Sequence, residues 1–184
     1  MQAELRPASD RYDPIAQGFH WLIAILVLIA FIIGPGGSEQ RVYGAANAGS
    51  LLWHEGLGST VLALTVLRLL WRLSHTPPAE PPMPAWMKTA AAAAHHGLYL
   101  LLFMTPLSAV GGAWLEGHDV SAFGVFTLRP PFATSHAIGA SIASIHGLLG
   151  DAILWLAGLH AAAALFHEFV LRDGLLRSML PRKP

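Results

Sequence analysis

The chain has 184 residues, of which 54% are apolar and only 12% are charged, and its 11 basic residues balance its 11 acidic ones. This composition and a mean hydropathy of +0.50 are typical of a membrane protein. The balanced charge gives no indication of a nucleic-acid partner. Cysteine is absent, which excludes disulfides, thiolate ligands and iron–sulfur clusters held by cysteine.

Four apolar segments are each long enough to cross a bilayer, whose hydrocarbon core needs about 20 helical residues. They cover residues 15–34, 50–73, 86–115 and 141–171. Because no water satisfies backbone groups inside a bilayer, helices are favoured there over irregular structure. We predict an all-α integral membrane four-helix bundle, formed as a single domain over residues 1–184.

The first helix should begin at Asp13, because aspartate caps a helix start and the proline that follows it fits the first turn. His20 lies near this end. Acidic residues precede the helix and no small-residue cleavage site follows Ile33, so we interpret it as retained rather than as a signal peptide. The second segment carries His54 near its start and Arg68 fourteen residues later, on nearly the same face.

A connector with five prolines, residues 75–84, separates the second segment from the third, which contains His95 and His96. Most lysines and arginines then fall on one side of the predicted topology, and only Arg41 and Arg129 fall on the other. Since positive residues concentrate on the cytoplasmic side, both termini are predicted in the cytoplasm. The residues on the cytoplasmic side are Arg6, Arg11, Arg68, Arg72, Lys88, Arg172, Arg177, Arg182 and Lys183.

The fourth segment places His146 and His160 fourteen residues apart. In a helix this spacing returns to within roughly 40° of one face, about 21 Å further along the axis. The antiparallel topology puts His54 at the level of His146 and His20 at the level of His160. An imidazole in hydrocarbon needs polar neighbours or a metal. Two histidine pairs at two levels are the arrangement required for two six-coordinate haems.

Small residues flank these histidines and would give a flat macrocycle clearance, although they also let bare helices approach closely. They include Gly18, Gly56, Gly58, Gly147 and Gly150. A single intramembrane histidine is more often a packing or proton-relay residue, so the haem interpretation depends on all four histidines together.

The sequence also resembles the bacterial cytochrome b561 family over nearly its whole length. The resemblance rests on His20-Trp21, His54, Arg68 within V-L-R-L-L-W-R-L, Ser144-Ile145-His146, Gly158-Leu159-His160 with the following A-A-A-A-L-F and His167, residues 123–128, and Met179-Leu-Pro-Arg-Lys. It implies a transmembrane cytochrome b with two b haems, one held by His20 and His160 and the other by His54 and His146. It further implies electron exchange with ubiquinone, coupled in characterised relatives to the oxidation of periplasmic superoxide.

Five further residues have candidate roles. Arg68 is expected to pair with a haem propionate, the alternative being an interface cation that extends to the membrane surface. Asp151 would hydrogen-bond a ligand imidazole or relay protons, or else be a protonated polar residue. His167, and His95 or His96 on the third helix, could protonate a reduced quinone. For each of these histidines a purely structural role at the interface is the alternative.

Three functions follow. The first is a di-haem oxidoreductase between a periplasmic donor, with superoxide as the candidate, and ubiquinone; membrane lipid is its remaining partner. The second is a haem-bearing anchor subunit that passes electrons from a periplasmic dehydrogenase to the quinone pool. The third is a haem-free transporter of metal or protons. The predicted periplasmic loops carry Glu39, Glu116 and Asp119 against Arg41 and Arg129, so no strongly positive funnel for an anion is visible.

Overall fold

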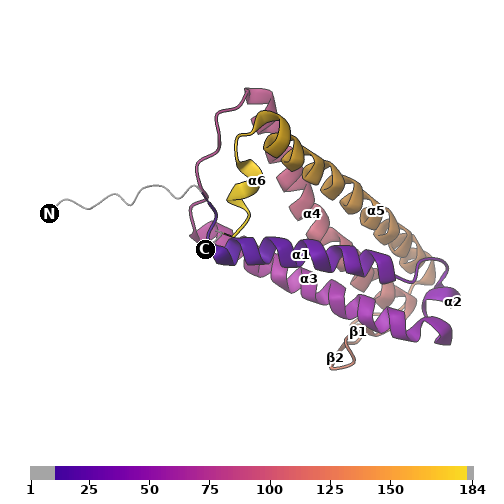
Figure 1. The fold of residues 1–184 in the computed structure, drawn as a ribbon. Helices are drawn as coiled ribbons and strands as arrows, with labels where there is room; N and C mark the ends of the chain where they lie inside the picture. The colour runs from indigo at the N-terminus through magenta and orange to yellow at the C-terminus, as the bar shows by residue number, and fades with distance from the viewer. Residues whose placement is uncertain (1–10, 182–184) are drawn as a thin grey trace.

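Four long helices dominate the computed structural model, which describes residues 11–181 (Figure 1). They are α1 (Pro14–Ile33), α3 (Ala48–Ser74), α4 (Ala85–Glu116) and α5 (His136–Phe166). Each is long and apolar enough to cross a membrane. The predicted all-α membrane bundle is therefore confirmed.

The predicted boundaries of α1, α3 and α4 are correct to within two residues. The fourth predicted segment begins five residues too late, because α5 already begins at His136, but its end is correct, because the helical span runs to Leu171. The α-helical part stops at Phe166. The chain then widens into a π-helical turn, η2 (His167–Leu171). The pattern of apolar residues does not predict the change from α-helix to π-helix at His167, since both kinds of turn can carry the same residues.

Short elements connect the helices at the two ends of the bundle. The hairpin end holds α2 (Glu39–Val42), η1 (Ala45–Asn47) and an antiparallel hairpin, β1 (Val120–Ala122) with β2 (Phe126–Leu128). At the opposite end, residues 172–181 include α6 (Leu175–Ser178) and run from α5 back to α1 (Figure 1). We call this segment the strap and this end the strap end.

The start of α1 has the predicted cap. The Asp13 carboxylate accepts hydrogen bonds from the backbone N–H groups of Ile15 and Ala16, at 3.0 and 2.9 Å. Pro14 occupies the first turn, where its missing N–H leaves no helical bond unmade. Burial acts to raise the pKa of Asp13, but these bonds and one from Trp71 hold that pKa below its usual value.

The strap is tied to α1 by hydrogen bonds. The Gln17 amide donates to the backbone oxygens of Tyr12 and Ser178, at 2.9 and 3.2 Å. The Trp21 indole donates to the oxygen of Met179 at 2.8 Å. Because the strap follows α5, these bonds fix the start of α1 relative to the end of α5.

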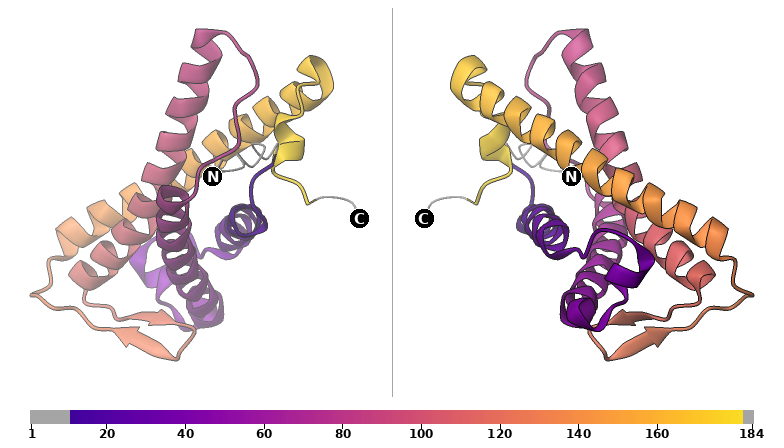
Figure 2. Two further views of the ribbon diagram at one scale, coloured as in Figure 1. Left: turned by 90° about the vertical axis from the view of Figure 1, so that its left-hand side faces the viewer. Right: turned by 90° about the vertical axis from the view of Figure 1, so that its right-hand side faces the viewer.

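The four helices form two packed pairs, α1 with α3 and α4 with α5 (Figure 2). Buried apolar side chains are few among the described residues, and large apolar side chains are exposed on all four helices, as expected where lipid surrounds the protein. The buried apolar residues are Ile23, Val61, Ala113, Val120 and Ile153. Contact between the helices therefore depends on close backbone approach more than on a filled core.

Basic residues of the described chain gather mainly at the strap end. Arg41 belongs to α2 and Arg129 follows β2, so these two lie at the hairpin end. The others lie where α1 begins, α3 ends, α4 begins or the strap follows α5: Arg11, Arg68, Arg72, Lys88, Arg172 and Arg177. Arg6, Arg182 and Lys183, which the sequence-based orientation also counts, lie outside the described residues.

The tightest approach of α4 and α5 is at Gly139. A Cβ atom there would lie 2.9 Å from the backbone nitrogen of Glu116 and 3.1 Å from the oxygen of Gly112, whereas a Cβ atom at Gly111 would meet nothing within 4 Å. We expect Gly139→Ala to lower the melting temperature of the purified protein. Gly111→Ala should leave it unchanged or raise it, since alanine favours a helix by about 1 kcal/mol over glycine. Equal melting temperatures for both variants would contradict this account of the packing.

Candidate functional site

The first histidine pair lies at the hairpin-end level of the bundle. The rings of His54 on α3 and His146 on α5 have centroids 5.9 Å apart and an interplanar angle of 84°. The Nδ1 of His54 lies 2.8 Å from the backbone oxygen of Ala30, and the Nδ1 of His146 lies 2.9 Å from that of Thr105. A carbonyl oxygen can only accept, so both Nδ1 atoms donate and both Nε2 atoms are left with lone pairs for a metal.

The second pair lies nearer the strap end. The ring centroids of His20 on α1 and His160 on α5 are 6.2 Å apart, with an interplanar angle of 69°. The ring of His95 on α4 also contacts His160, at 5.3 Å. The indole of Trp21 packs edge-on against His20 at 5.2 Å. The structure thus brings together all four sequence-predicted ligands as two pairs, and adds His95 to the second.

The ring separations fit one metal ion between each pair of imidazoles. A metal–imidazole bond is about 2 Å long, so two rings on opposite sides of one ion have centres roughly 6 Å apart. The separation of His95 from His160 is shorter than this, which favours His20 as the partner of His160. Among the described residues, no group of three or more histidine or acidic side chains could hold a metal by itself. Further ligands would have to come from a macrocycle such as haem.

Two glycines leave open space beside the hairpin-end pair. Gly58 and Gly150 each follow a histidine by four residues, which places them on the same helix faces as His54 and His146. A Cβ atom at either glycine would meet no other atom within 4 Å. This clearance suits a flat macrocycle. Gly56, in contrast, makes room for the ring of Phe123 from the hairpin, since its Cβ would lie 2.3 Å from that ring.

Arg68 supplies a positive charge at the strap-end pair. Its Nε donates to the hydroxyl of Tyr99 at 3.1 Å, and its charge acts on the imidazoles of His20, His95 and His160. Its Nη1 is buried and finds no hydrogen-bond partner in the described part of the chain. A buried guanidinium nitrogen without an acceptor indicates a site for an anionic group, such as a haem carboxylate.

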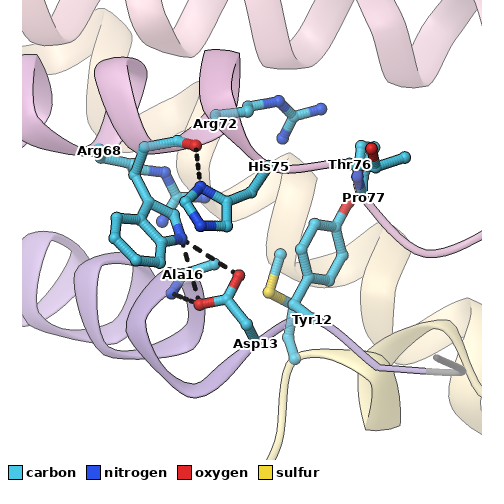
Figure 3. Close-up of a pocket in the computed structure, with 10 residues that line it drawn as sticks. Tyr12, Asp13, Ala16, Arg68, Arg72, His75, Thr76 and Pro77 are labelled. Atoms are coloured by element: carbon cyan, nitrogen blue, oxygen red, sulfur yellow. Dashed lines mark hydrogen bonds between the residues drawn. The ribbon is translucent and has the colours of Figure 1, made fainter. Parts of the chain in front are cut away.

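A shallow pocket opens beside Arg68 at the strap end (Figure 3). Arg68 and Arg72 line it, together with Trp71, whose ring stacks on His75 at 3.8 Å and 11°. The Trp71 indole donates to the Asp13 carboxylate at 3.1 Å, which joins the end of α3 to the start of α1. The pocket therefore presents two cations, one carboxylate and the aromatic rings of Tyr12, Trp71 and His75.

The remaining predicted residues lie in different places. His167 is buried beside Asp173 in the strap, and its Nδ1 is 2.5 Å from the Asp173 carboxylate. His96 is exposed, with its Nδ1 2.7 Å from the oxygen of Ala92 on its own helix, so it does not join the site. The sequence contained no separate signal for Asp173, because its contact with His167 depends on the turn between them.

Asp151 does not contact the imidazoles. It lies five residues after His146, about 140° around the helix. It shares an exposed face of α5 with Leu148, Trp155 and Leu159, which are 68%, 77% and 66% exposed. The predicted hydrogen bond from Asp151 to a ligand imidazole is absent among the described residues, because helical rotation turns this carboxyl away from the histidine face.

The hairpin end is rich in carboxyl groups. Glu55 accepts a hydrogen bond from the backbone of Ser121 at 2.8 Å, which anchors β1 to α3. Glu39 lies 3.1 Å from the Nε2 of His118, whose ring stacks on Tyr43 at 3.5 Å. Burial, with Glu116 and other neighbouring carboxyl groups, raises the pKa of Tyr43. This end is therefore negative in character, unlike the strap end.

Comparison with known proteins agrees with this geometry. Residues 11–182 match the sequence profile of the prokaryotic cytochrome b561 family. The chain is 31% identical to cytochrome b561 homolog 2 of Escherichia coli, over 93% of this chain and 92% of that protein. It is 30% identical to the probable superoxide oxidase CybB of Yersinia pestis, over 94% and 97% of the two chains. It is 34% identical to cytochrome b562 of Cereibacter sphaeroides, over 93% and 96%. With a profile match along nearly all of its length, and two histidine pairs positioned to hold metal inside a membrane bundle, this chain belongs to the prokaryotic cytochrome b561 family.

Proposed function

We propose that this protein carries two b haems and moves electrons across the bacterial inner membrane, from a periplasmic donor to ubiquinone. Family membership already makes it a membrane cytochrome that binds haem b and transfers electrons. The proposal adds the number of haems, their ligands and the two substrates. It rests on one observation above all: two imidazole pairs, each with the spacing of a shared metal, at two levels of the bundle.

In this proposal His54 and His146 hold the haem at the hairpin end, and His20 and His160 hold the haem at the strap end. The α5 ligands are fourteen residues apart, or about 21 Å along the helix. The Nδ1 bonds to Ala30 and Thr105 fix the orientation of the first pair. Arg68 would bind a propionate of the second haem. When bound, the haems supply one-electron transfer, and the chain supplies their positions and electrostatic surroundings.

The orientation in the membrane follows from the charges. Six described lysines and arginines belong to the strap end and two to the hairpin end. By the positive-inside rule the strap end faces the cytoplasm, with both termini, and the hairpin end faces the periplasm. A donor would then give up electrons at the hairpin end, and ubiquinone would be reduced at the strap end.

Superoxide is the proposed donor because one relative is named a probable superoxide oxidase. The balanced reaction oxidises two superoxide anions to two dioxygen molecules and reduces one ubiquinone, which takes up two protons to become ubiquinol. Two histidines would hold each haem, and the bound haem would supply the one-electron chemistry that oxidises superoxide. The carboxyl groups of the hairpin end oppose the approach of an anion, which makes the donor the first point to test.

The donor test uses the detergent-purified holoprotein and an enzymatic source of superoxide. We expect the haem bands to become reduced, superoxide dismutase to prevent this, and a short-chain ubiquinone to reoxidise the bands. Haems that stay oxidised in superoxide would contradict that donor. If they are instead reduced through a periplasmic subunit that co-purifies with the chain, the protein is an anchor subunit. The exposed apolar hairpin tip, with Val125 90% exposed, favours that second function.

The haem ligands can be tested by haem content per chain. Alanine variants of His20, His54, His146 and His160 should each lose about half of the haem, and a double variant within one pair should lose no more than either single variant. A double variant across the two pairs should lose nearly all of it. His95→Ala is the matched control and should keep both haems. Loss of the strap-end haem in His95→Ala but not in His20→Ala would assign the ligand to His95 instead.

Arg68 can be tested through the reduction potential of the strap-end haem. Removal of a nearby positive charge stabilises the oxidised haem, so Arg68→Gln should lower that potential by roughly tens of millivolts. The potential of the hairpin-end haem should change less, because it is a further four turns away. Arg72→Gln, one turn beyond Arg68 and exposed, is the control and should have a smaller effect. Equal shifts in both variants would mean that Arg68 makes no specific contact with the haem.

A further inference from the structure

We propose that Asp173 in the strap positions the imidazole of His167 to donate a proton to ubiquinone at the strap end. The inference rests on the proposed reduction of ubiquinone there, and it assigns to Asp173 a positioning role in that reaction. His167 would be the residue that touches the quinone, and Asp173 would act through His167.

The contact between the two side chains is short and sheltered. The Nδ1 of His167 lies 2.5 Å from one carboxylate oxygen of Asp173, and the two side chains are 10% and 18% exposed. The other carboxylate oxygen accepts a hydrogen bond from the Leu175 N–H at 3.1 Å. Asp173 is therefore held from both sides.

Asp173 is charged at neutral pH. Burial acts to raise its pKa, but the hydrogen bonds from His167 and the Leu175 N–H outweigh burial and hold that pKa below its usual value. A carboxylate has no proton to donate, so Nδ1 must be the donor in this bond. The contact thus fixes one tautomer of His167 and leaves Nε2 as the reactive nitrogen, as the aspartate does in a Ser-His-Asp triad.

The backbone between His167 and Asp173 turns so that the two side chains meet. η2 is a π turn, a form that is frequent at functional sites. It is followed by Arg172 at φ 55° and Gly174 at φ 78°, two left-handed residues that turn the chain back on itself. A left-handed arginine is uncommon and strained. The reversal brings Asp173 back to a histidine six residues earlier.

His167 has the right position relative to the proposed haem. It follows His160 by seven residues, which returns it to within roughly 20° of the same face, about 10 Å nearer the strap end. It is 8% exposed, and no hydrogen bond is present at its Nε2 in the described part of the chain. A ring nitrogen that makes no hydrogen bond among the described residues, on the face that carries a candidate haem ligand, is free to exchange a proton with a bound ligand.

Three other charged groups belong to the elements around His167. Glu168 in η2 pairs with Arg177 of α6 at 2.7 Å, through one carboxylate oxygen. The second Glu168 oxygen is buried and has no partner among the described residues. Arg172 adjoins Asp173 in the turn and is exposed. Asp173 is therefore the charged side chain that contacts His167 in the described part of the chain, and one of the two neighbouring arginines is already paired.

The proton balance is simple. Reduction of ubiquinone to ubiquinol takes two electrons, which a haem bound at the strap end would supply, and two protons. The imidazolium of His167 gives one of them from Nε2 to a quinone oxygen, while Nδ1–H stays bonded to Asp173. The ring is then neutral, and Nε2 takes a new proton from water after ubiquinol leaves. The second quinone proton comes from solvent.

The test compares two oxidants on the prereduced holoprotein by stopped flow, at pH 6 to 9. A short-chain ubiquinone needs protons, and ferricyanide does not.

Asp173→Asn keeps an oxygen for the Leu175 N–H but loses the charge. We expect it to slow haem oxidation by the quinone by roughly ten- to a hundredfold. Ferricyanide oxidation should not change. Asp173→Glu should restore much of the quinone rate, and Glu80→Gln, an exposed charge removal in the proline-rich connector, should have no effect.

A second measurement needs no altered carboxylate. The ¹⁵N chemical shifts of His167 in the wild-type protein, assigned with His167→Gln, should report the Nδ1–H tautomer at pH 8. The Nε2–H tautomer would overturn the proposal, and so would an Asp173→Asn variant with wild-type quinone kinetics at every pH. Equal slowing with quinone and ferricyanide would also overturn it, because it would show a general structural defect. If quinone fails to oxidise the wild-type haems at all, the proposed ubiquinone reduction itself fails.

Discussion

The structure depends on how an imidazole is satisfied inside a membrane. A neighbouring helix can offer a carbonyl to one ring nitrogen, and the other nitrogen still needs a partner. At the hairpin-end pair, Ala30 and Thr105 provide those carbonyls, so His54 is tied to α1 and His146 to α4. Gly34 gives the ring of His54 its space, because a Cβ there would lie 3.1 Å from that ring. The Nε2 atoms of His54 and His146 are left without these bonds, and the separation of the two rings fits one metal ion between them. The contacts that pack the helices therefore also orient the two candidate metal ligands.

This arrangement explains why so little of the described chain is buried. α1 packs with α3 and α4 with α5, and the two pairs are joined at their ends, by the hairpin anchored through Glu55 and by the strap held by Gln17 and Trp21. Lipid surrounds the outer faces, and the space between the pairs holds imidazoles rather than interlocked apolar side chains. A bound macrocycle would therefore contribute to the cohesion of the bundle as well as to its chemistry, by stabilising the folded state that binds it.

The sequence was sufficient for the helices and for the four-histidine arrangement, because both follow from apolar length and from the fixed rotation of an α-helix. It was insufficient where the backbone leaves that geometry. The early start of α5 at His136, the π turn after Phe166 and the return of the strap depend on dihedral angles and long-range contacts that no local pattern records. Asp151 shows a different limit. Its depth along α5 follows directly from its place in the sequence, but the rotation of about 100° per residue also turns its side chain to the exposed face of the helix, away from His146.

The two ends of the bundle differ in charge, and this difference has a direction. Carboxyl groups lie at the hairpin end, where negative charge would stabilise an oxidised haem and lower its potential. At the strap end the guanidinium of Arg68 acts on the imidazoles of the second pair, and it would raise the potential of a haem held there. Electrons placed on the proposed hairpin-end haem would therefore move toward the strap end. The positive charge at the strap end thus supports both parts of the proposal, the cytoplasmic position of that end by the positive-inside rule and the flow of electrons toward it.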